Sequence, residues 1–380
     1  MSHQTFTIGI DCRMYSPNFT GIGRYVYELV QNLQKIDTQN HYVLFFNDPE
    51  YSEFEAANPN FKKVLVSSKY YSIQEQTRFL KFLNRYKLDL MHFTHFNSPI
   101  LYRRPSIVTI HDLTLHFFPG KKMTKPWHRL AYRLTAGSSI RKAKRVIAVS
   151  RSTAKDLQEV MATPLKKVQI IYEGVGPEFH QIIDQNSLMA TRQKYHLPGR
   201  FLLYTGNWRN HKNILGLIEA FRLLKINPVN ADLQLVITGK KDNPYAEEIL
   251  AAAGNLISTN QIILPGLVPD HELINLMNLT TVYVFPSFYE GFGLPPLEAM
   301  ACGTPVACSN TSCLPEICGK NVLYFNPYHP TEIAQTVQAL LSDDKLRQSL
   351  IESGLQYVKK FSWEKMAQET YQLYLDALQK

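Results

Sequence analysis

The alternation of short apolar strands with helix-length amphipathic segments is the feature that most limits how this chain can fold. Strand-like runs recur along nearly the whole sequence, from TFTIGID at residues 5–11 to NVLYFNP at residues 321–327. Helical stretches such as GRYVYELVQNL (23–33) and KNILGLIEAFRLL (212–224) lie between them. Strands that alternate with helices are typical of parallel sheets in α/β proteins. We therefore expect an α/β fold made of doubly wound, Rossmann-like sheets.

The strands fall into two series, and a chain of 380 residues suits two domains. Glycines and prolines punctuate the stretch between the two series. We predict a first domain over residues 1–180, a connector over 181–199, a second domain over 200–361 and a terminal helix over 362–380. When two such sheets face each other, ligands bind in the cleft that is lined by the loops at the carboxyl ends of the strands.

The composition argues against several classes of protein. The five cysteines are an odd number without a C-x-x-C pair, so neither a disulfide framework nor a zinc site is indicated. The N-terminus lacks the basic and apolar regions of a signal peptide, and no apolar run is long enough to span a membrane. We expect a protein of the reducing cytoplasm.

The net charge of +9 is concentrated in the first half of the chain. Residues 1–190 hold 25 Lys and Arg against 15 Asp and Glu, and the region 113–155 holds 11 basic residues and no acidic one. Such a region could attract a polyanion, and we expect it to rest on an anionic membrane surface. A solvated basic face that only aids solubility is the alternative. Nucleic acid is not an expected partner, because no nucleic-acid-binding signature accompanies the region.

The segment EGFGLPPLEAM, residues 290–300, places Glu290 and Glu298 on either side of a stretch that is almost free of polar side chains. Glycines let the backbone approach a ligand closely, and the start of a helix offers unpaired N–H groups and partial positive charge to a phosphate. Carboxylates accept strong hydrogen bonds from hydroxyls. The pair therefore suits a ligand with hydroxyls on both sides of a diphosphate, although Glu298 could simply complement the helix dipole.

The longer segment FPSFYEGFGLPPLEAMACGTPVACSNTSCLPEI resembles the E-x7-E region of retaining glycosyltransferase family 4. Further segments that resemble this family follow in the expected order: IGIDCRMYSPNFTGIGRYVYEL, TIHD, VIAVSRSTAKDL, IIYEGV, LYTGNWRNHKN, LVITGKKD and IILPGLVPDHEL. The resemblance covers essentially the whole chain. It implies the GT-B fold, in which two Rossmann-like domains face each other and a C-terminal helix, here FSWEKMAQETYQLY, crosses back to the first domain.

The resemblance also implies roles for residues of the second domain. Glu290 would contact the donor sugar, Glu298 the ribose and Lys212 the pyrophosphate. The residues between the two carboxylates would turn their backbone amides towards the sugar and the diphosphate: Gly291, Phe292, Gly293 and Leu294.

The loop after Gly206 departs from the commonest pattern of the family. Where many relatives have an arginine directly after this glycine, the chain has Asn207, and Arg209 follows two positions later. We choose Arg209 as the second diphosphate contact, because a fork-shaped cation stabilises a departing diphosphate well. Asn207 is the alternative contact, and Arg209 would then be an ordinary exposed arginine.

The resemblance assigns three further positions. His111, at the end of TIHD, would lie beside the donor sugar, and whether it acts chemically or only positions the sugar stays open. Gly21 and Gly23 resemble the first glycine-rich loop, near the acceptor and the diphosphate, although a helix-capping turn would also explain them. Leu267 and Val268 would hold the nucleobase through their backbone.

No cofactor and no metal are expected. The chain contains no D-x-D, and its cations and helix terminus could supply the positive charge that a divalent ion would otherwise give.

A dinucleotide-dependent oxidoreductase is disfavoured because TGIGRYV lacks the third glycine of G-x-G-x-x-G. A non-catalytic protein that binds polyanions or membranes would not explain Glu290, Glu298 and Lys212. An epimerase or phosphorylase of the same fold is disfavoured by the complete, ordered set of motifs.

Two segments, GNWRNHKN and CSNTSCLPEI, look most like those of bacterial mannosyltransferases of O-antigen and related polysaccharide assembly. This resemblance implies GDP-mannose as the donor, with a UDP-sugar of glucose or N-acetylglucosamine as the alternative. The acceptor would be a polyprenyl-linked or growing glycan. The enzyme would then be cytoplasmic and peripheral on the inner membrane.

Overall fold

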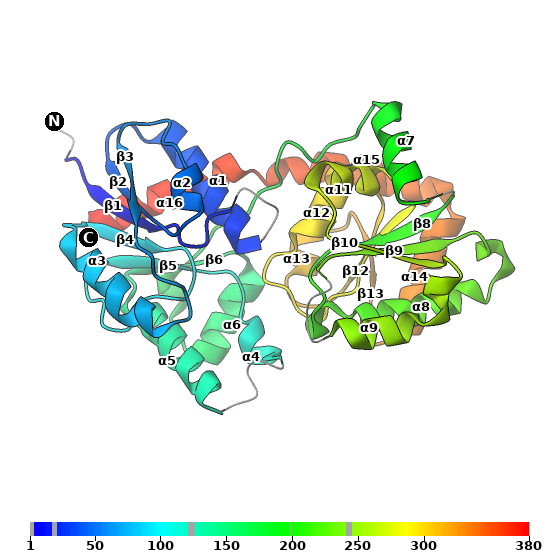
Figure 1. Ribbon diagram of the computed structural model, residues 1–380, viewed down its shortest axis with the longest axis horizontal. Coiled ribbons are helices and arrows are strands. Elements are labelled where there is room, and N and C mark those ends of the chain that lie inside the picture. The colour runs from blue at the N-terminus through cyan, green and yellow to red at the C-terminus, as the bar shows by residue number, and fades with distance from the viewer. Residues whose placement is uncertain (1–3, 17–20, 121–125, 198, 241–244, 380) are drawn as a thin grey trace. The chain divides into compact units, whose positions relative to one another are not determined.

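Parallel strand pairing defines both sheets of the protein (Figure 1). The first unit of the chain comprises Met1–Gly174 and Ser362–Lys380, and the second comprises Val175–Phe361. The first unit therefore ends before residue 180, and the predicted connector belongs to the second unit. Both units are α/β and Rossmann-like, which confirms the predicted fold class. The structure, a computed structural model, describes residues 4–16, 21–120, 126–197, 199–240 and 245–379.

Seven strands form the sheet of the first unit, in the order β3-β2-β1-β4-β5-β6-β7. They are β1 (Thr7–Asp11), β2 (His41–Phe46), β3 (Phe61–Leu65), β4 (Leu90–Phe93), β5 (Ser106–Ile110), β6 (Arg145–Ala148) and β7 (Val168–Ile170). All neighbours are parallel, and Gly9 of β1 lies opposite Val43 on one side and Met91 on the other. The chain winds outward from β1 in both directions, so the strand order reverses there, at the place where such folds bind ligands.

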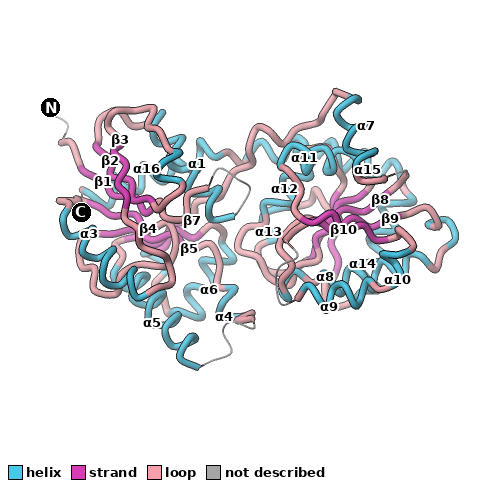
Figure 2. The backbone as a smooth tube through the Cα atoms, viewed as in Figure 1, coloured by secondary structure: helices cyan, strands magenta, loops and turns pink. Residues whose placement is uncertain are grey.

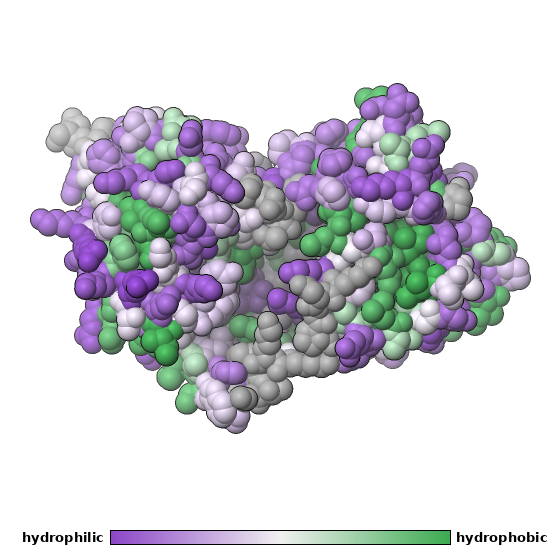
Figure 3. Space-filling view, in the orientation of Figure 1, coloured by the Kyte–Doolittle hydropathy of each residue, from purple (hydrophilic) through white to green (hydrophobic). Residues whose placement is uncertain are grey.

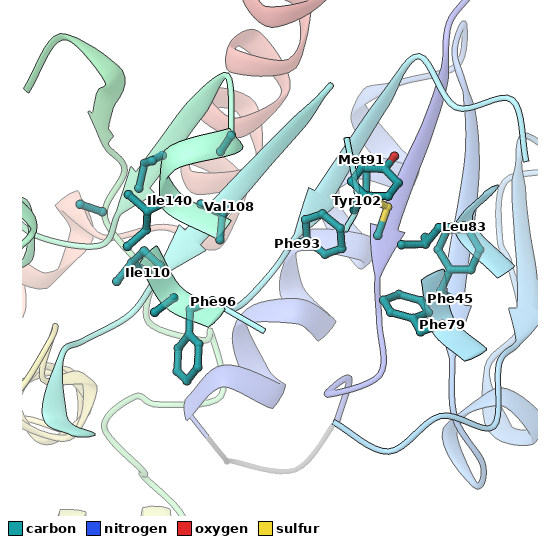
Figure 4. Packing of buried hydrophobic residues seen from close by; sticks show 14 of the residues in the cluster. Phe45, Phe79, Leu83, Met91, Phe93, Phe96, Tyr102, Val108, Ile110 and Ile140 are labelled. Atoms are coloured by element: carbon teal, nitrogen blue, oxygen red, sulfur yellow. The ribbon is translucent and has the colours of Figure 1, made fainter. Parts of the chain in front are cut away.

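Helices cover both faces of this sheet (Figure 2). They are α1 (Gly21–Ile36), α2 (Glu50–Glu53), α3 (Leu80–Arg85), α4 (Thr114–Phe117), α5 (Pro126–Lys142), α6 (Arg151–Met161) and α16 (Trp363–Leu378), with a π-helical turn over Glu75–Phe79 before α3. The hydrophobic core between the strands and α3, α5 and α6 includes Phe45, Met91, Phe93, Val108 and Ile110 (Figure 4).

The terminal helix α16 packs on α1 and β4 of the first unit. Ser362 caps the helix, because its hydroxyl accepts a hydrogen bond from the backbone N–H of Lys365 at 3.4 Å. Further along, the Tyr374 hydroxyl lies 2.6 Å from Nδ1 of the buried His92 on β4. The last helix therefore belongs to the first unit although it follows the second unit in sequence.

Six parallel strands form the second sheet, in the order β10-β9-β8-β11-β12-β13. They are β8 (Phe201–Tyr204), β9 (Gln234–Thr238), β10 (Ile262–Gly266), β11 (Val282–Phe285), β12 (Val306–Ser309) and β13 (Leu323–Phe325). The helices are α7 (Gln185–Lys194), α8 (Ile214–Lys225), α9 (Ala246–Ala253), α10 (Asn255–Ser258), α11 (Asp270–Leu279), α12 (Leu294–Ala301), α13 (Leu314–Cys318), α14 (Pro330–Ser342) and α15 (Asp344–Tyr357). In the figure, α8, α9 and α14 cover one face of the sheet and α11 and α12 the other (Figure 2).

The predicted connector is an integral part of the second unit, because it contains α7 and this helix packs on α11. The amide nitrogen of Asn275 on α11 donates to Ser187 Oγ at 2.9 Å and to Thr191 Oγ1 at 2.8 Å. Asn275 is buried, so these hydrogen bonds satisfy an amide that burial would otherwise leave unpaired. Polar residues within the segment 181–199 therefore hold it to the domain that follows.

The described residues test three expectations from the composition, on membrane-spanning helices, disulfides and metal ligands. Within them, no helix is both long and apolar enough to cross a membrane. All five cysteines are buried and unpaired. No three His, Cys, Asp or Glu side chains of the described part of the chain gather closely enough to hold a metal ion.

Gly174 provides a test of this packing, because it lies against the start of α16. A Cβ atom on Gly174 would lie 2.1 Å from the backbone nitrogen of Trp363, which no packed structure tolerates without movement. We expect Gly174→Ala to lower the free energy of unfolding by about 1–3 kcal/mol, as overpacking does, in urea denaturation. Gly137→Ala on α5 is the matched control, because a Cβ atom there meets nothing within 4 Å. Equal stabilities of the two variants would contradict the steric argument.

Candidate functional site

The loop between β11 and α12 carries the first of the two predicted carboxylates. Gly293 at the start of α12 has a φ of 92°, in the left-handed region that favours glycine. The backbone N–H of Glu290 donates to Ser312 Oγ at 3.0 Å, and the thiol of Cys313 donates to the carbonyl of Phe292 at 3.1 Å. These bonds from the segment before α13 fix the path of the loop.

The structure brings Lys212 and Glu290 together, although 78 residues separate them. Lys212 follows β8 in a 3-10 turn over Asn210–Lys212, and β8 and β11 are neighbours in the sheet. Its Nζ lies 2.7 Å and 2.9 Å from the two carboxylate oxygens of Glu290. Both side chains are partly exposed, at 18% and 13%. An ammonium and a carboxylate thus stand together at the carboxyl edge of the second sheet, within reach of a ligand.

Asn213 shapes the turn that presents Lys212. Its φ of 54° is left-handed, a conformation that asparagine tolerates better than most residues. The Asn213 amide nitrogen donates to the carbonyl of Pro327 at 2.7 Å and to that of Pro286 at 3.2 Å. The turn after β8 is therefore tied to the end of β11, which places the lysine beside the glutamate.

The other residues predicted to bind the donor lie around the same edge of the second sheet, because all its strands run in one direction. Glu298 lies in α12 and is partly exposed. Gly206 and the exposed Asn207 follow β8, and the 71% exposed Leu267 follows β10 together with Val268. The sequence prediction that these positions bind a ligand stays a prediction.

Arg209 stands apart from the Lys212–Glu290 pair. It lines a pocket of about 220 Å³ with Asn210, Tyr245, Glu248 and Phe288, between the starts of α8 and α9. The same turn therefore carries one cation paired with Glu290 and a second cation on the wall of this pocket.

His111 of the first unit uses both of its ring nitrogens within the protein. Nδ1 lies 3.0 Å from Glu173 Oε1, and Nε2 lies 3.0 Å from the backbone carbonyl oxygen of Thr94. Both ring nitrogens of His111 therefore lie within hydrogen-bond distance of an oxygen atom of the protein. Burial, together with the charge of His111, lowers the pKa of the neighbouring His92 to about 3. These contacts fix the orientation of the His111 ring within the first unit.

A second buried charge cluster follows β1, and the sequence analysis missed it. The Arg13 guanidinium donates to Asp11 at 2.8 Å and 2.6 Å and to Glu75 at 2.7 Å. All three side chains are less than 10% exposed. Burial raises the pKa of Glu75, and Arg13 opposes that rise. The D-x-R spacing at the end of the first strand could have indicated the contact between Asp11 and Arg13. Nothing in the sequence indicates that Glu75 joins them, or that Glu173 contacts His111.

The predicted glycine-rich loop is described only in part, because residues 17–20 lie outside the described residues. Gly21 is the first residue of α1, and Gly23 lies in its first turn. The carbonyl of Gly23 accepts a hydrogen bond from the backbone N–H of Ser16 at 3.3 Å. The two glycines thus stand at a helix start.

The basic region 113–155 lies on α4, α5, β6 and α6, and residues 121–125 within it are outside the described residues. On α5, Trp127, Leu130 and Leu134 are 59%, 57% and 56% exposed. Their spacing of three and four residues puts them on one side of the helix. Arg129 and Arg133 on the same helix are also exposed. Figure 3 shows apolar side chains among polar ones at the surface over α5.

Two family models match the chain. Residues 19–179 match "Glycosyltransferase Family 4", and residues 190–357 match "Glycosyl transferases group 1". The two matches agree with the division into two units and with the family resemblance of the motifs.

Named relatives are similar to the chain in sequence, and a solved structure is similar to it in fold. The chain is 29% identical to an Escherichia coli "O-antigen chain mannosyltransferase B" over 372 residues, which cover 93% of this chain and 96% of that one. It is 34% identical to the E. coli "Serotype-specific mannosyltransferase WbdA" over 269 residues, 69% of this chain, and spans only 32% of that longer relative. The fold is similar to that of sucrose-phosphate synthase from Thermosynechococcus elongatus, with a TM-score of 0.79, 21% identity and 98% coverage of both chains.

The His111–Glu173 pair generates a stability prediction. Glu173→Gln replaces the carboxylate that contacts the buried His111 ring with a neutral amide, so we expect the free energy of unfolding to fall by about 1–3 kcal/mol in urea denaturation. The control is Glu159→Gln, because Glu159 lies 3.8 Å from Lys155 and both side chains are at least 60% exposed. That change should cost less than about 1 kcal/mol. Similar losses in the two variants would show that the buried pair carries no special stability.

Proposed function

Because the chain belongs to glycosyltransferase family 4, we propose that it transfers mannose from GDP-mannose to a polyprenyl-linked or growing glycan, with retention of the anomeric configuration. The two relatives described above support mannose as the sugar, since both are named mannosyltransferases. The name of the full-length relative supports a place in the assembly of a cell-surface polysaccharide of the O-antigen kind.

The observation that carries this proposal is the contact between Lys212 and Glu290 at the edge of the second sheet. A nucleotide-sugar presents a diphosphate beside a hydroxylated ring, and this pair presents a cation beside a hydrogen-bond acceptor. In the proposal, Lys212 binds the diphosphate and Glu290 accepts hydrogen bonds from the sugar hydroxyls. The positive end of α12 adds to the stabilisation of the departing diphosphate.

The remaining donor contacts follow the family resemblance. Glu298 binds the ribose, and Arg209 is the second cation for the diphosphate, with Asn207 as the alternative. The other donor-binding positions act through their backbone: Gly206, Leu267, Val268, Gly291, Phe292, Gly293 and Leu294. The two cations take the place of a divalent metal ion, so no cofactor is needed in this proposal.

In the proposed reaction, the bond between the anomeric carbon and the phosphate oxygen breaks while the acceptor oxygen bonds to the same face of that carbon. The departing phosphate oxygen takes the proton of the acceptor hydroxyl. His111 is in keeping with this route, because both of its ring nitrogens already lie within hydrogen-bond distance of protein oxygens. We propose that His111 acts on the sugar through its position.

We also propose that the region 113–155 holds the enzyme on the cytoplasmic face of an anionic inner membrane, where a lipid-linked acceptor would be presented. Exposed Arg129 and Arg133 on α5 would attract the lipid headgroups, each by about 1 kcal/mol. Trp127 and Leu130 on the same helix could enter the interface between the headgroups and the acyl chains.

Donor binding is tested by thermal unfolding with GDP-, UDP-, ADP- and dTDP-sugars. A ligand that binds only the folded protein raises its melting temperature, so GDP-mannose should give the largest rise.

Glu290→Gln keeps the shape of the side chain and should lower kcat about 10²-fold or more, by analogy with other lost electrostatic contacts in active sites. Glu219→Gln, at a half-exposed ion pair on α8, is the control. The transferase proposal fails if no nucleotide-sugar shifts the melting temperature and Glu290→Gln keeps full activity.

Membrane binding is tested by co-sedimentation with vesicles that contain anionic lipid. Raising the salt to about 1 M shortens the screening length to about 3 Å, so we expect the protein to leave the vesicles. Trp127→Ala should weaken binding at low salt further, because it removes the apolar contact. Vesicles of neutral lipid are the control. Binding that does not change with salt would contradict the electrostatic part of the proposal.

A further inference from the structure

Two tyrosines of the second sheet are alike in burial and in their contact with Phe285 but differ in the hydrogen bonding of their hydroxyls. Tyr204 on β8 and Tyr283 on β11 are both fully buried, and their rings stack on Phe285 at centroid distances of 6.4 Å and 6.3 Å. The Tyr283 hydroxyl lies 2.7 Å from Thr205 Oγ1. The Tyr204 hydroxyl has no hydrogen-bond partner among the described residues. A buried hydroxyl without a partner lowers the free energy of unfolding, so a contribution to stability does not explain the Tyr204 hydroxyl.

The Tyr204 hydroxyl points towards the loop that follows β8. A Cβ atom on Gly206 would lie 3.0 Å from this hydroxyl oxygen, so the hydroxyl lies directly against the backbone of Gly206. The Lys212 ammonium lies 5.7 Å from the centroid of Phe285, the ring on which Tyr204 stacks. Because Lys212 contacts Glu290, the Tyr204 ring and the carboxylate belong to one cluster around Phe285 and Lys212. Burial raises the pKa of Tyr204, and the charges of Tyr283 and Glu290 add to that rise.

Glu290 changes partners if the proposed function holds. In the structure, Lys212 contacts both of its carboxylate oxygens. A diphosphate that draws the lysine away would leave this carboxylate, which is only 13% exposed, with the neutral hydroxyls of the sugar as its donors. A further hydrogen-bond donor from the protein would then stabilise the carboxylate and fix its orientation.

We propose that Tyr204 is a positioning residue for Glu290. When the diphosphate of the donor engages Lys212, the Tyr204 hydroxyl donates a hydrogen bond to the Glu290 carboxylate and holds it towards the sugar hydroxyls. In the protein without ligand, the Tyr204 hydroxyl is thus a hydrogen-bond donor that is not yet used. This inference rests on the proposed function, because it takes a nucleotide-sugar as the ligand.

The test compares Tyr204→Phe with the matched control Tyr283→Phe. Both changes remove one buried hydroxyl from a ring that stacks on Phe285. In thermal unfolding without ligand, Tyr204→Phe should be at least as stable as wild type, whereas Tyr283→Phe should be less stable because it loses a hydrogen bond. Calorimetric binding should show that Tyr204→Phe binds GDP-mannose about 10-fold more weakly, as expected for one hydrogen bond to a charged group, and binds GDP unchanged. Its kcat should fall as well.

Each contrary result has a distinct meaning. If Tyr204→Phe destabilises the protein without ligand as Tyr283→Phe does, the hydroxyl has a structural partner and the proposal is overturned. If Tyr204→Phe binds GDP-mannose and turns over like wild type, or weakens GDP and GDP-mannose equally, Tyr204 does not act through Glu290 and the proposal is also overturned. If wild type binds no nucleotide-sugar, the proposed function itself fails and the role of Tyr204 fails with it.

Discussion

All strands of each sheet are parallel to their neighbours, and this constraint decides where charged groups can meet in either unit. Because every strand ends at the same edge, residues far apart in sequence become neighbours there. Lys212 and Glu290 meet after β8 and β11, and His111 and Glu173 meet after β5 and β7. Arg13, just after β1, binds Asp11 at the end of that strand and also Glu75 in the π-helical turn before α3.

The two units use their charged groups differently. In the first unit the ion pairs of Arg13 and the His111–Glu173 pair are less than 10% exposed, and both ring nitrogens of His111 have partners within the protein. These groups are shielded from solvent. In the second unit Lys212 and Glu290 are partly exposed, so their contact can be exchanged for contacts with a ligand. The first arrangement suits positioning, and the second suits binding and chemistry.

Much of this organisation could be predicted from the sequence. The strand pattern predicts the fold, and the ordered motifs predict the family, because both depend on residues that are close in the chain. The partners of His111 and Arg13 could not be predicted, since Glu173 and Glu75 lie 62 residues away from them in each case. The place of the segment 181–199 within the second unit could not be predicted either, because the polar contacts that hold α7 to α11 leave no periodic pattern in that segment.

The pairing of Lys212 with Glu290 has a consequence for selectivity. A free lysine at this edge would attract any small anion of the cell, inorganic phosphate included. The charge of a lysine that already has a carboxylate 2.7 Å away is locally neutralised. A bare phosphate must therefore displace Glu290 from the lysine, and it has no sugar hydroxyls to donate hydrogen bonds to the displaced carboxylate. A ligand that carries both an anion and hydroxyls can satisfy the two side chains at once. In the proposed function, the pair would thereby disfavour a bare phosphate without any steric barrier.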